Sequence, residues 1–117
     1  MSDAAVLDQI KGEIEKEIAD NKICIYTKGT RENPRCGFTM ETAQFFDKLG
    51  VPYTMIDVLD NPAKRQLLNE LANWPTLPKA YINGEFFGDT DVLEPMLQNG
   101  ELKVLLEKAF PGQTINA

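Results

Sequence analysis

The stretch KICIYTKGTRENPRCGFTMETAQFFDKLGVPYTMIDV, residues 22–58, decides the fold that the sequence predicts. It begins with KICIYT (22–27), a run of β-branched and aromatic residues that is typical of a strand. A polar loop punctuated by glycine and proline covers 28–34, and residues 36–49 have the pattern of a helix that ends before a glycine. The end of the stretch predicts a second strand over 53–58. Strand, helix and strand in this order imply two parallel strands joined by a right-handed crossover.

Helices are also predicted before and after this stretch. Apolar residues recur at spacings of three and four over residues 4–20, which predicts an amphipathic helix (Leu7, Ile10, Ile14 and Ile18). Further along, Asn61 is a typical N-cap and Pro62 suits the first position of a helix. We therefore expect a helix to begin there and to end before the two-proline segment WPTLP (74–78).

The last part of the chain predicts a hairpin and two short helices. The hairpin is KAYINGEFFG (79–88), because Asn83-Gly84 is the dipeptide best suited to a tight type I′ turn. The helices are expected over 91–98 and 101–109. Since the hairpin adds antiparallel strands to the parallel pair, the chain is predicted to form one α/β domain over 1–117. Its architecture would be thioredoxin-like, with a central mixed four-stranded sheet flanked by helices.

Composition and charge narrow the class of function. The 117 residues are 43% hydrophobic and 26% charged, as in an ordinary globular domain. A net charge of −6, from 12 basic and 18 acidic side chains, argues against binding to nucleic acid or to an anionic membrane. No apolar run approaches the roughly 18 residues of a membrane span. The charged start MSDAAVLDQIKGEIEKE is typical of a helix and not of a secretory signal.

The cysteine and histidine content points to thiol chemistry. The chain has two cysteines and no histidine, which excludes a disulfide-rich secreted domain and favours the cytoplasm or another reducing compartment. A zinc site within one chain needs about four cysteine or histidine ligands and is excluded too. Because acid–base catalysis by histidine is also absent, any chemistry is expected to involve a thiol.

The two cysteines are predicted to play different parts. Cys36 stands at the start of the predicted helix over 36–49, where unpaired N–H groups and the helix dipole favour a thiolate. An ordinary thiol is only about 3% thiolate at pH 7, and three basic residues precede Cys36 (Lys28, Arg31 and Arg35). We therefore interpret Cys36 as a reactive thiolate, the alternative being a small buried side chain. Cys24, inside an apolar strand, is predicted to pack in the core, with a regulatory thiol as the alternative.

Five short motifs resemble one protein family. They are KGT (28–30), P-x-CGF (34–38), LGVPY (49–53), NWPTLP (73–78) and INGEFFG (82–88). In this order and at these spacings the sequence is similar to single-domain monothiol glutaredoxins with the signature CGFS, over about residues 6–109. The resemblance implies a thioredoxin fold that binds glutathione and, as a dimer, a [2Fe–2S] cluster.

The resemblance also assigns a role to each motif residue. Cys36 would be the reactive thiolate and the cluster ligand, with the cluster shared with a second subunit. Lys28 would reach the glutathione thiolate region and a terminal carboxylate, and Arg65 would pair with the glycyl carboxylate. Taken alone, both cations could equally be ordinary solvated charges.

The remaining glutathione contacts are carried over in the same way. Leu77, before a Pro78 that is expected to be cis, would offer its backbone N–H and C=O to the cysteinyl part of the ligand. Thr90 and Asp91 would hold the γ-glutamyl end, through a backbone N–H and through a carboxylate facing the amino group. Without the resemblance, these two residues could simply cap a helix.

The chain departs from the family pattern at two places. Thr39 replaces the signature serine and keeps its hydroxyl, with one methyl group more. The segment 88–91 reads G-D-T-D where the family has G-G-C-D. The second cysteine of that motif is therefore missing, and Asp89 places a negative side chain beside a ligand carboxylate.

Two functions from different classes follow. A [2Fe–2S] cluster takes four thiolates, which two subunits and two glutathione molecules would supply. This predicts a homodimeric carrier that is a monomer without its cluster and that exchanges clusters with donor and acceptor proteins in iron homeostasis. The alternative is a glutathione-dependent thiol–disulfide oxidoreductase that acts on protein mixed disulfides. A module used only for protein docking would leave the cationic surroundings of Cys36 unexplained.

Overall fold

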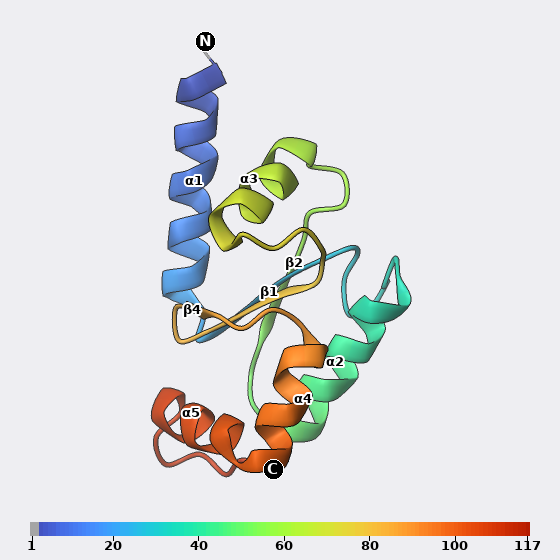
Figure 1. Cartoon of the computed structure of the whole chain (residues 1–117), viewed down its shortest axis with the longest axis vertical. Helices are drawn as coiled ribbons and strands as arrows, with labels where there is room; N and C mark the ends of the chain where they lie inside the picture. The colour runs from blue at the N-terminus through green and yellow to red at the C-terminus, as the bar shows by residue number, and fades with distance from the viewer. Residues whose placement is uncertain (1–2) are drawn as a thin grey trace.

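A mixed four-stranded sheet forms the centre of the protein. The computed structural model describes residues 3–117, and its strands lie in the order β2-β1-β3-β4 (Figure 1). β1 (Ile23–Thr27) pairs in parallel with β2 (Thr54–Asp57) and antiparallel with β3 (Lys79–Ile82). The short β4 (Glu85–Phe86) completes the hairpin with β3. The predicted thioredoxin-like fold is confirmed.

The described residues form five helices around this sheet. They are α1 (Asp3–Asp20), α2 (Gly37–Leu49), α3 (Pro62–Ala72), α4 (Thr90–Asn99) and α5 (Glu101–Ala109). Figure 1 shows α1 beside α3 at one side of the sheet, with α2, α4 and α5 at the other. Within the described part of the chain, none of these helices is both long and apolar enough to cross a membrane.

Alternating side chains of β1 build a separate core on each face of the sheet. Ile23 and Ile25 pack into the larger core with side chains from α2, α4 and α5. Cys24 and Tyr26 point the other way, into a core that includes Ile14 of α1 and side chains of α3. Cys24 is fully buried, and burial raises its pKa to about 11. It therefore packs in the core, as the sequence predicts.

Local signals place the ends of the elements. The Asn61 side chain accepts a hydrogen bond of 3.2 Å from the N–H of Lys64, so Asn61 caps α3. Asn83 and Gly84 both have positive φ, 51° and 85°, which is the geometry that a type I′ turn requires. Cys36 lies just before α2 as its N-cap, not inside the helix.

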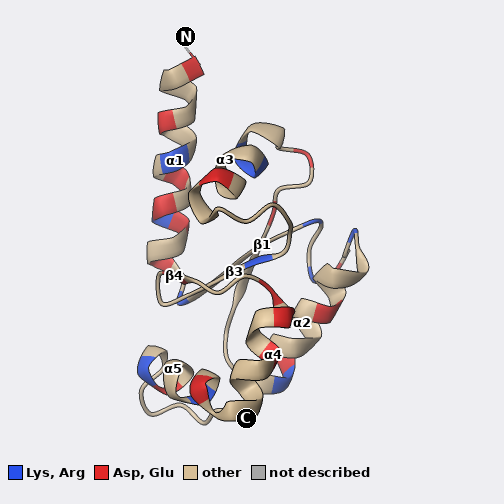
Figure 2. Ribbon diagram, viewed as in Figure 1, with Lys and Arg blue, Asp and Glu red and all other residues tan. Residues whose placement is uncertain are grey.

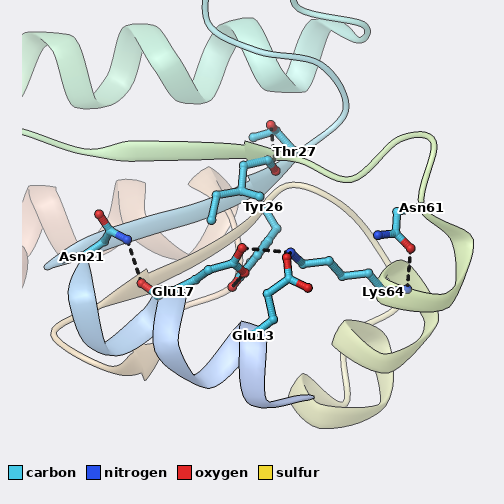
Figure 3. Close-up of polar contacts among 8 residues, drawn as sticks. Glu13, Glu17, Asn21, Tyr26, Thr27, Asn61 and Lys64 are labelled. Carbon is cyan, nitrogen blue, oxygen red and sulfur yellow. Dashed lines mark hydrogen bonds and ion pairs between the residues drawn. The ribbon is translucent and has the colours of Figure 1, made fainter. Parts of the chain in front are cut away.

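A buried ion pair holds α3 against α1. Lys64 Nζ lies 3.1 Å from Glu13 Oε1 and 2.9 Å from Glu17 Oε2, and its side chain is nearly inaccessible (Figure 3). The Tyr26 hydroxyl donates a bond of 2.9 Å to the second oxygen of Glu17. The charge of Lys64 is thus balanced where it is buried, as stable burial of a cation requires. The pair positions α3, which carries Arg65.

Candidate functional site

Cys36 occupies the N-cap position of α2 in an extended conformation, with φ −157° and ψ 159°. Its sulfur is partly accessible and lies 3.3 Å from the Thr39 hydroxyl oxygen. That hydroxyl donates a bond of 3.0 Å to the carbonyl of Lys28, and its single proton can be directed to the sulfur instead when Cys36 is a thiolate. The buried Thr39 side chain therefore connects the thiol to the end of β1.

The surroundings of Cys36 favour its thiolate. Partial burial by itself raises the pKa of this thiol, but hydrogen bonds from Thr39 and from the Phe38 N–H outweigh that effect. The charge of Lys28 acts in the same direction, so the pKa of Cys36 lies below its ordinary value. This is the chemistry that a nucleophilic or metal-binding thiol needs.

The two arginines of the preceding loop are directed elsewhere. Arg31 pairs with Asp47 on α2, with Nη2 3.0 Å from Oδ2. Arg35 lies near Asp57 and contributes to the lowered pKa of that carboxyl, whose main cause is hydrogen bonding from backbone N–H groups. Of the three predicted cations, Lys28 is thus the one that stabilises the Cys36 thiolate.

A cavity of about 330 Å³ is lined by residues that are close to Cys36 in the chain, although not by Cys36 itself. It brings together all six residues that the sequence predicts for ligand binding: Lys28, Arg65, Leu77, Pro78, Thr90 and Asp91. These come from the end of β1, from α3, from the turn before β3 and from the start of α4. Phe38, two residues after Cys36, also lines the cavity. Residues distant in the sequence therefore form one site, and Lys28 connects it to Cys36, whose pKa its charge lowers.

One carboxylate fixes the two segments that carry the cations. Asp57 Oδ1 accepts bonds of 2.9 Å from the N–H groups of both Gly29 and Leu59. Gly29 follows Lys28, and the carbonyl of Leu59 accepts a bond of 3.3 Å from the Arg65 guanidinium. That bond uses one of the five N–H donors of the Arg65 guanidinium. Arg65 also lines the cavity.

The turn before β3 and the start of α4 form the rest of the site. The Leu77-Pro78 bond is cis, as the family resemblance implies. Thr90 is the first residue of α4, and its hydroxyl donates a bond of 3.1 Å to Glu41 on α2. Asp89 is the N-cap, since its carboxylate accepts a bond of 3.0 Å from the N–H of Asp91. Acidic residues therefore gather at the start of α4 (Figure 2).

Comparison with known proteins agrees with this arrangement. A family model described as glutaredoxin matches residues 23–87. A Synechocystis protein named monothiol glutaredoxin ycf64-like is 41% identical over 102 residues, which are 87% of this chain and 95% of that protein. The chain belongs to the monothiol glutaredoxin family.

Solved structures show the same fold for this glutaredoxin. The mature form of 1CGrx1 from Trypanosoma brucei is 32% identical, with a TM-score of 0.79 over 94% of this chain and 76% of that one. A buckwheat glutaredoxin–glutathione complex has the same TM-score, at 21% identity, over 88% of this chain and 92% of that one. At that identity the buckwheat structure shows the fold alone.

Sequence reasoning missed several residues that line the cavity of this glutaredoxin. Asn69, Pro75 and Thr76 lie in its wall, beside the predicted contacts. The two-proline segment was a signal for the latter two, because it interrupts the pattern of secondary structure. The contact between Glu41 and Thr90 joins two helices and has no sequence signal.

Proposed function

We propose that the protein binds glutathione in the cavity beside Cys36 and, as a homodimer, carries a [2Fe–2S] cluster between donor and acceptor proteins. The observation that supports the proposal is the cavity itself, which gathers all six predicted ligand contacts and includes Lys28, whose charge helps to lower the pKa of Cys36. The buckwheat glutaredoxin whose fold this chain shares was solved as a complex with glutathione, which supports the choice of ligand.

The chemistry of the cavity suits an anionic tripeptide. Lys28 and Arg65 provide positive charge for carboxylates, with Arg65 assigned to the glycyl carboxylate. Leu77 offers backbone groups to the cysteinyl part, as an added strand would. The N–H of Thr90 and the carboxylate of Asp91 are assigned to the carboxylate and ammonium of the γ-glutamyl end. This orientation directs the ligand's thiol toward Cys36.

The donor set of one chain fits a shared cluster. A [2Fe–2S] cluster needs four thiolates, and Cys36 is the accessible one, because Cys24 is buried in a core on the α1 and α3 face. The described residues contain no group of three or more side chains that could hold a metal ion. Two copies of Cys36 and two glutathione thiolates complete the set. Since half of these ligands dissociate, the cluster is suited to transfer as cargo.

Anaerobic reconstitution with iron, sulfide and glutathione tests the proposal. We expect visible absorption bands from the cluster together with a shift from monomer to dimer in gel filtration. Omitting glutathione and other small thiols, or replacing Cys36→Ser, should abolish both signals. The matched variant Cys24→Ser should keep them. Undiminished cluster formation without glutathione or without Cys36 would refute the proposed ligand set.

A second candidate function is favoured by the accessible, low-pKa thiol. The Cys36 thiolate could attack the glutathione sulfur of a protein mixed disulfide, releasing the protein thiolate and forming a disulfide between Cys36 and glutathione. A second glutathione would then displace Cys36 and leave as oxidised glutathione. Turnover of a glutathionylated protein measures this activity. Fast turnover together with failed reconstitution would favour the oxidoreductase over the carrier.

A further inference from the structure

The ammonium group of Lys79 lies directly behind the wall of the cavity. Lys79 is the first residue of β3 and its exposed fraction is 0%. Its Nζ donates two bonds of 2.6 Å, one to the Asn69 side chain and one to the Thr76 carbonyl. Both acceptors belong to residues that line the cavity. The cation is therefore separated from a bound ligand by the groups to which it donates.

The charge of Lys79 is not balanced within the described part of the protein. Lys64, which is also buried, pairs with two carboxylates, whereas both acceptors of Lys79 are neutral and none of the ion pairs among residues 3–117 includes it. Burial, and secondarily the charge of Arg65, lower the pKa of Lys79 to about 8. A buried cation without a counter-ion destabilises a fold, so the position calls for an anion from outside the chain.

The neighbouring charges do not supply that anion. Tyr26 is the register partner of Lys79 on β1, and its phenol donates to Glu17, whose carboxylate also binds Lys64. Further ionisable groups stand on the elements around the cavity: Lys28 after β1, Asp57 at the end of β2, Arg65 on α3, and Asp89 and Asp91 at the start of α4. The lowered pKa of Lys79 has two causes, first its burial and then the charge of Arg65. Neither of these is a carboxylate.

We propose that Lys79 is a third cation of the glutathione site, for which the ligand carboxylate held at Arg65 provides the missing counter-charge. The inference rests on the proposed glutathione binding. Lys79 acts on the ligand through the cavity wall, as a positioning residue. Because Lys79 is buried, its attraction to a ligand carboxylate is screened less than an attraction between two exposed charges. Ligand binding therefore favours the protonated amine, and glutathione affinity falls as the pH rises past the value at which the free protein loses this proton.

Calorimetric titration with S-methylglutathione tests the inference, because this ligand keeps the carboxylates and lacks a free thiol. Between pH 7 and pH 9.5, the affinity of both the wild-type protein and Lys79→Met is measured. We expect the affinity of the wild type to fall roughly tenfold more than that of the variant over this range. At pH 7, Lys79→Met should bind about tenfold more weakly than wild type. The two factors must agree, since deprotonation and substitution remove the same charge. The ligand's own amino group titrates equally in both titrations.

Two controls separate this role from a structural one. Lys103→Met removes an equivalent charge from the exposed surface of α5 and should leave affinity within about twofold of wild type. Lys79→Met should melt a few degrees higher than wild type at pH 7, because it removes an unbalanced buried charge. Lys79→Gln serves as the second variant, and weaker binding by a protein of equal or higher melting temperature is the expected signature.

The outcomes distinguish the two proposals. If wild-type protein does not bind S-methylglutathione at any pH, the proposed function itself fails. If wild type binds and both Lys79 variants bind equally well with the same pH profile, the inference about Lys79 is overturned and glutathione binding stands. Weaker binding accompanied by a lower melting temperature in both variants would also overturn it, since Lys79 would then be a structural residue.

Discussion

The carboxylate of Asp89 both caps α4 and lines the cavity. The cap satisfies an N–H at the start of the helix, which stabilises α4. The same charge stands where the proposed γ-glutamyl carboxylate would bind, so it opposes the ligand. A single residue thus stabilises the fold at some expense of affinity.

Asp89→Gly is expected to strengthen glutathione binding several-fold at low ionic strength, with a smaller gain at high salt, because a like charge is removed. Cluster loss should slow in parallel. Asp89→Ser is the matched control, since serine keeps a capping oxygen without the charge. Titrations of the three proteins at two salt concentrations measure the effect. Weaker binding by both variants would show that Asp89 helps to build the site.

Thr39 controls the reactivity of Cys36 through its hydroxyl. Thr39→Val keeps the shape of the buried side chain but removes the hydroxyl, whose proton can turn from the Lys28 carbonyl to the sulfur and so favour the thiolate. The pKa of Cys36 should therefore rise, and alkylation by iodoacetamide at pH 6.5 should slow several-fold. Thr39→Ser, which retains the hydroxyl, should keep the wild-type pH profile of the alkylation rate. An unchanged profile in the valine variant would assign the lowered pKa to backbone N–H groups and Lys28 instead.

At the scale of elements, the ends of β1 and β2 act as one unit. Asp57 closes β2 and accepts bonds from the segments that follow both strands. These bonds, first from Leu59 and then from Gly29, lower the pKa of the Asp57 carboxyl. A carboxyl whose pKa is lower in the folded state stabilises the protein above its unfolded pKa, near 3.9. That contribution is lost as the pH falls through the folded value.

Asp57→Ala should lower the free energy of unfolding by about 1–2 kcal/mol at pH 7, a modest value because the carboxylate is exposed to solvent. The difference from wild type should shrink as the pH falls below about 4, because the stabilisation by the carboxylate is lost between its unfolded pKa and its lower folded pKa. Urea denaturation at pH 7 and pH 3 measures both. Asp60→Asn, on the same exposed segment, is the control. A loss of equal size at both pH values would show that charge plays no part.

At the scale of the whole molecule, two large apolar side chains are exposed in the helix that follows Cys36. Phe38 and Met40, in the first turn of α2, expose 63% and 49% of their surface. We expect two subunits that share a cluster through Cys36 to bring these side chains, two and four residues after it in the chain, toward each other. Burial of such residues would favour the dimer even though each subunit carries a net charge of −6.

Met40→Glu should therefore prevent the cluster-bridged dimer, because it places two carboxylates in an apolar contact. Met40 is not among the residues that line the cavity, so glutathione binding should stay within about twofold of wild type. Val104→Glu is the matched control, since Val104 is similarly exposed, at 53%, on α5. Gel filtration after reconstitution measures dimer formation. A normal dimer of Met40→Glu would place the interface elsewhere.

The order and type of the elements could be read from the sequence alone. Asn61 caps α3, Asn83-Gly84 forms the turn of the hairpin, and Cys36 stands at the start of α2. Each of these signals acts within a few residues, through hydrogen bonds and backbone conformations that depend on immediate neighbours. The strand–helix–strand order then implied the parallel pair at the centre of the sheet.

The pairing of charges was decided only by the tertiary structure. Arg31 looked available to the thiol but binds Asp47, sixteen residues away on another element. Lys79, a polar residue at the start of a strand, is completely buried behind a cavity whose walls come from five parts of the chain. Burial and charge pairing depend on segments that meet only after folding. For that reason the sequence determined which residues surround Cys36, and the folded chain determined which of them act on it.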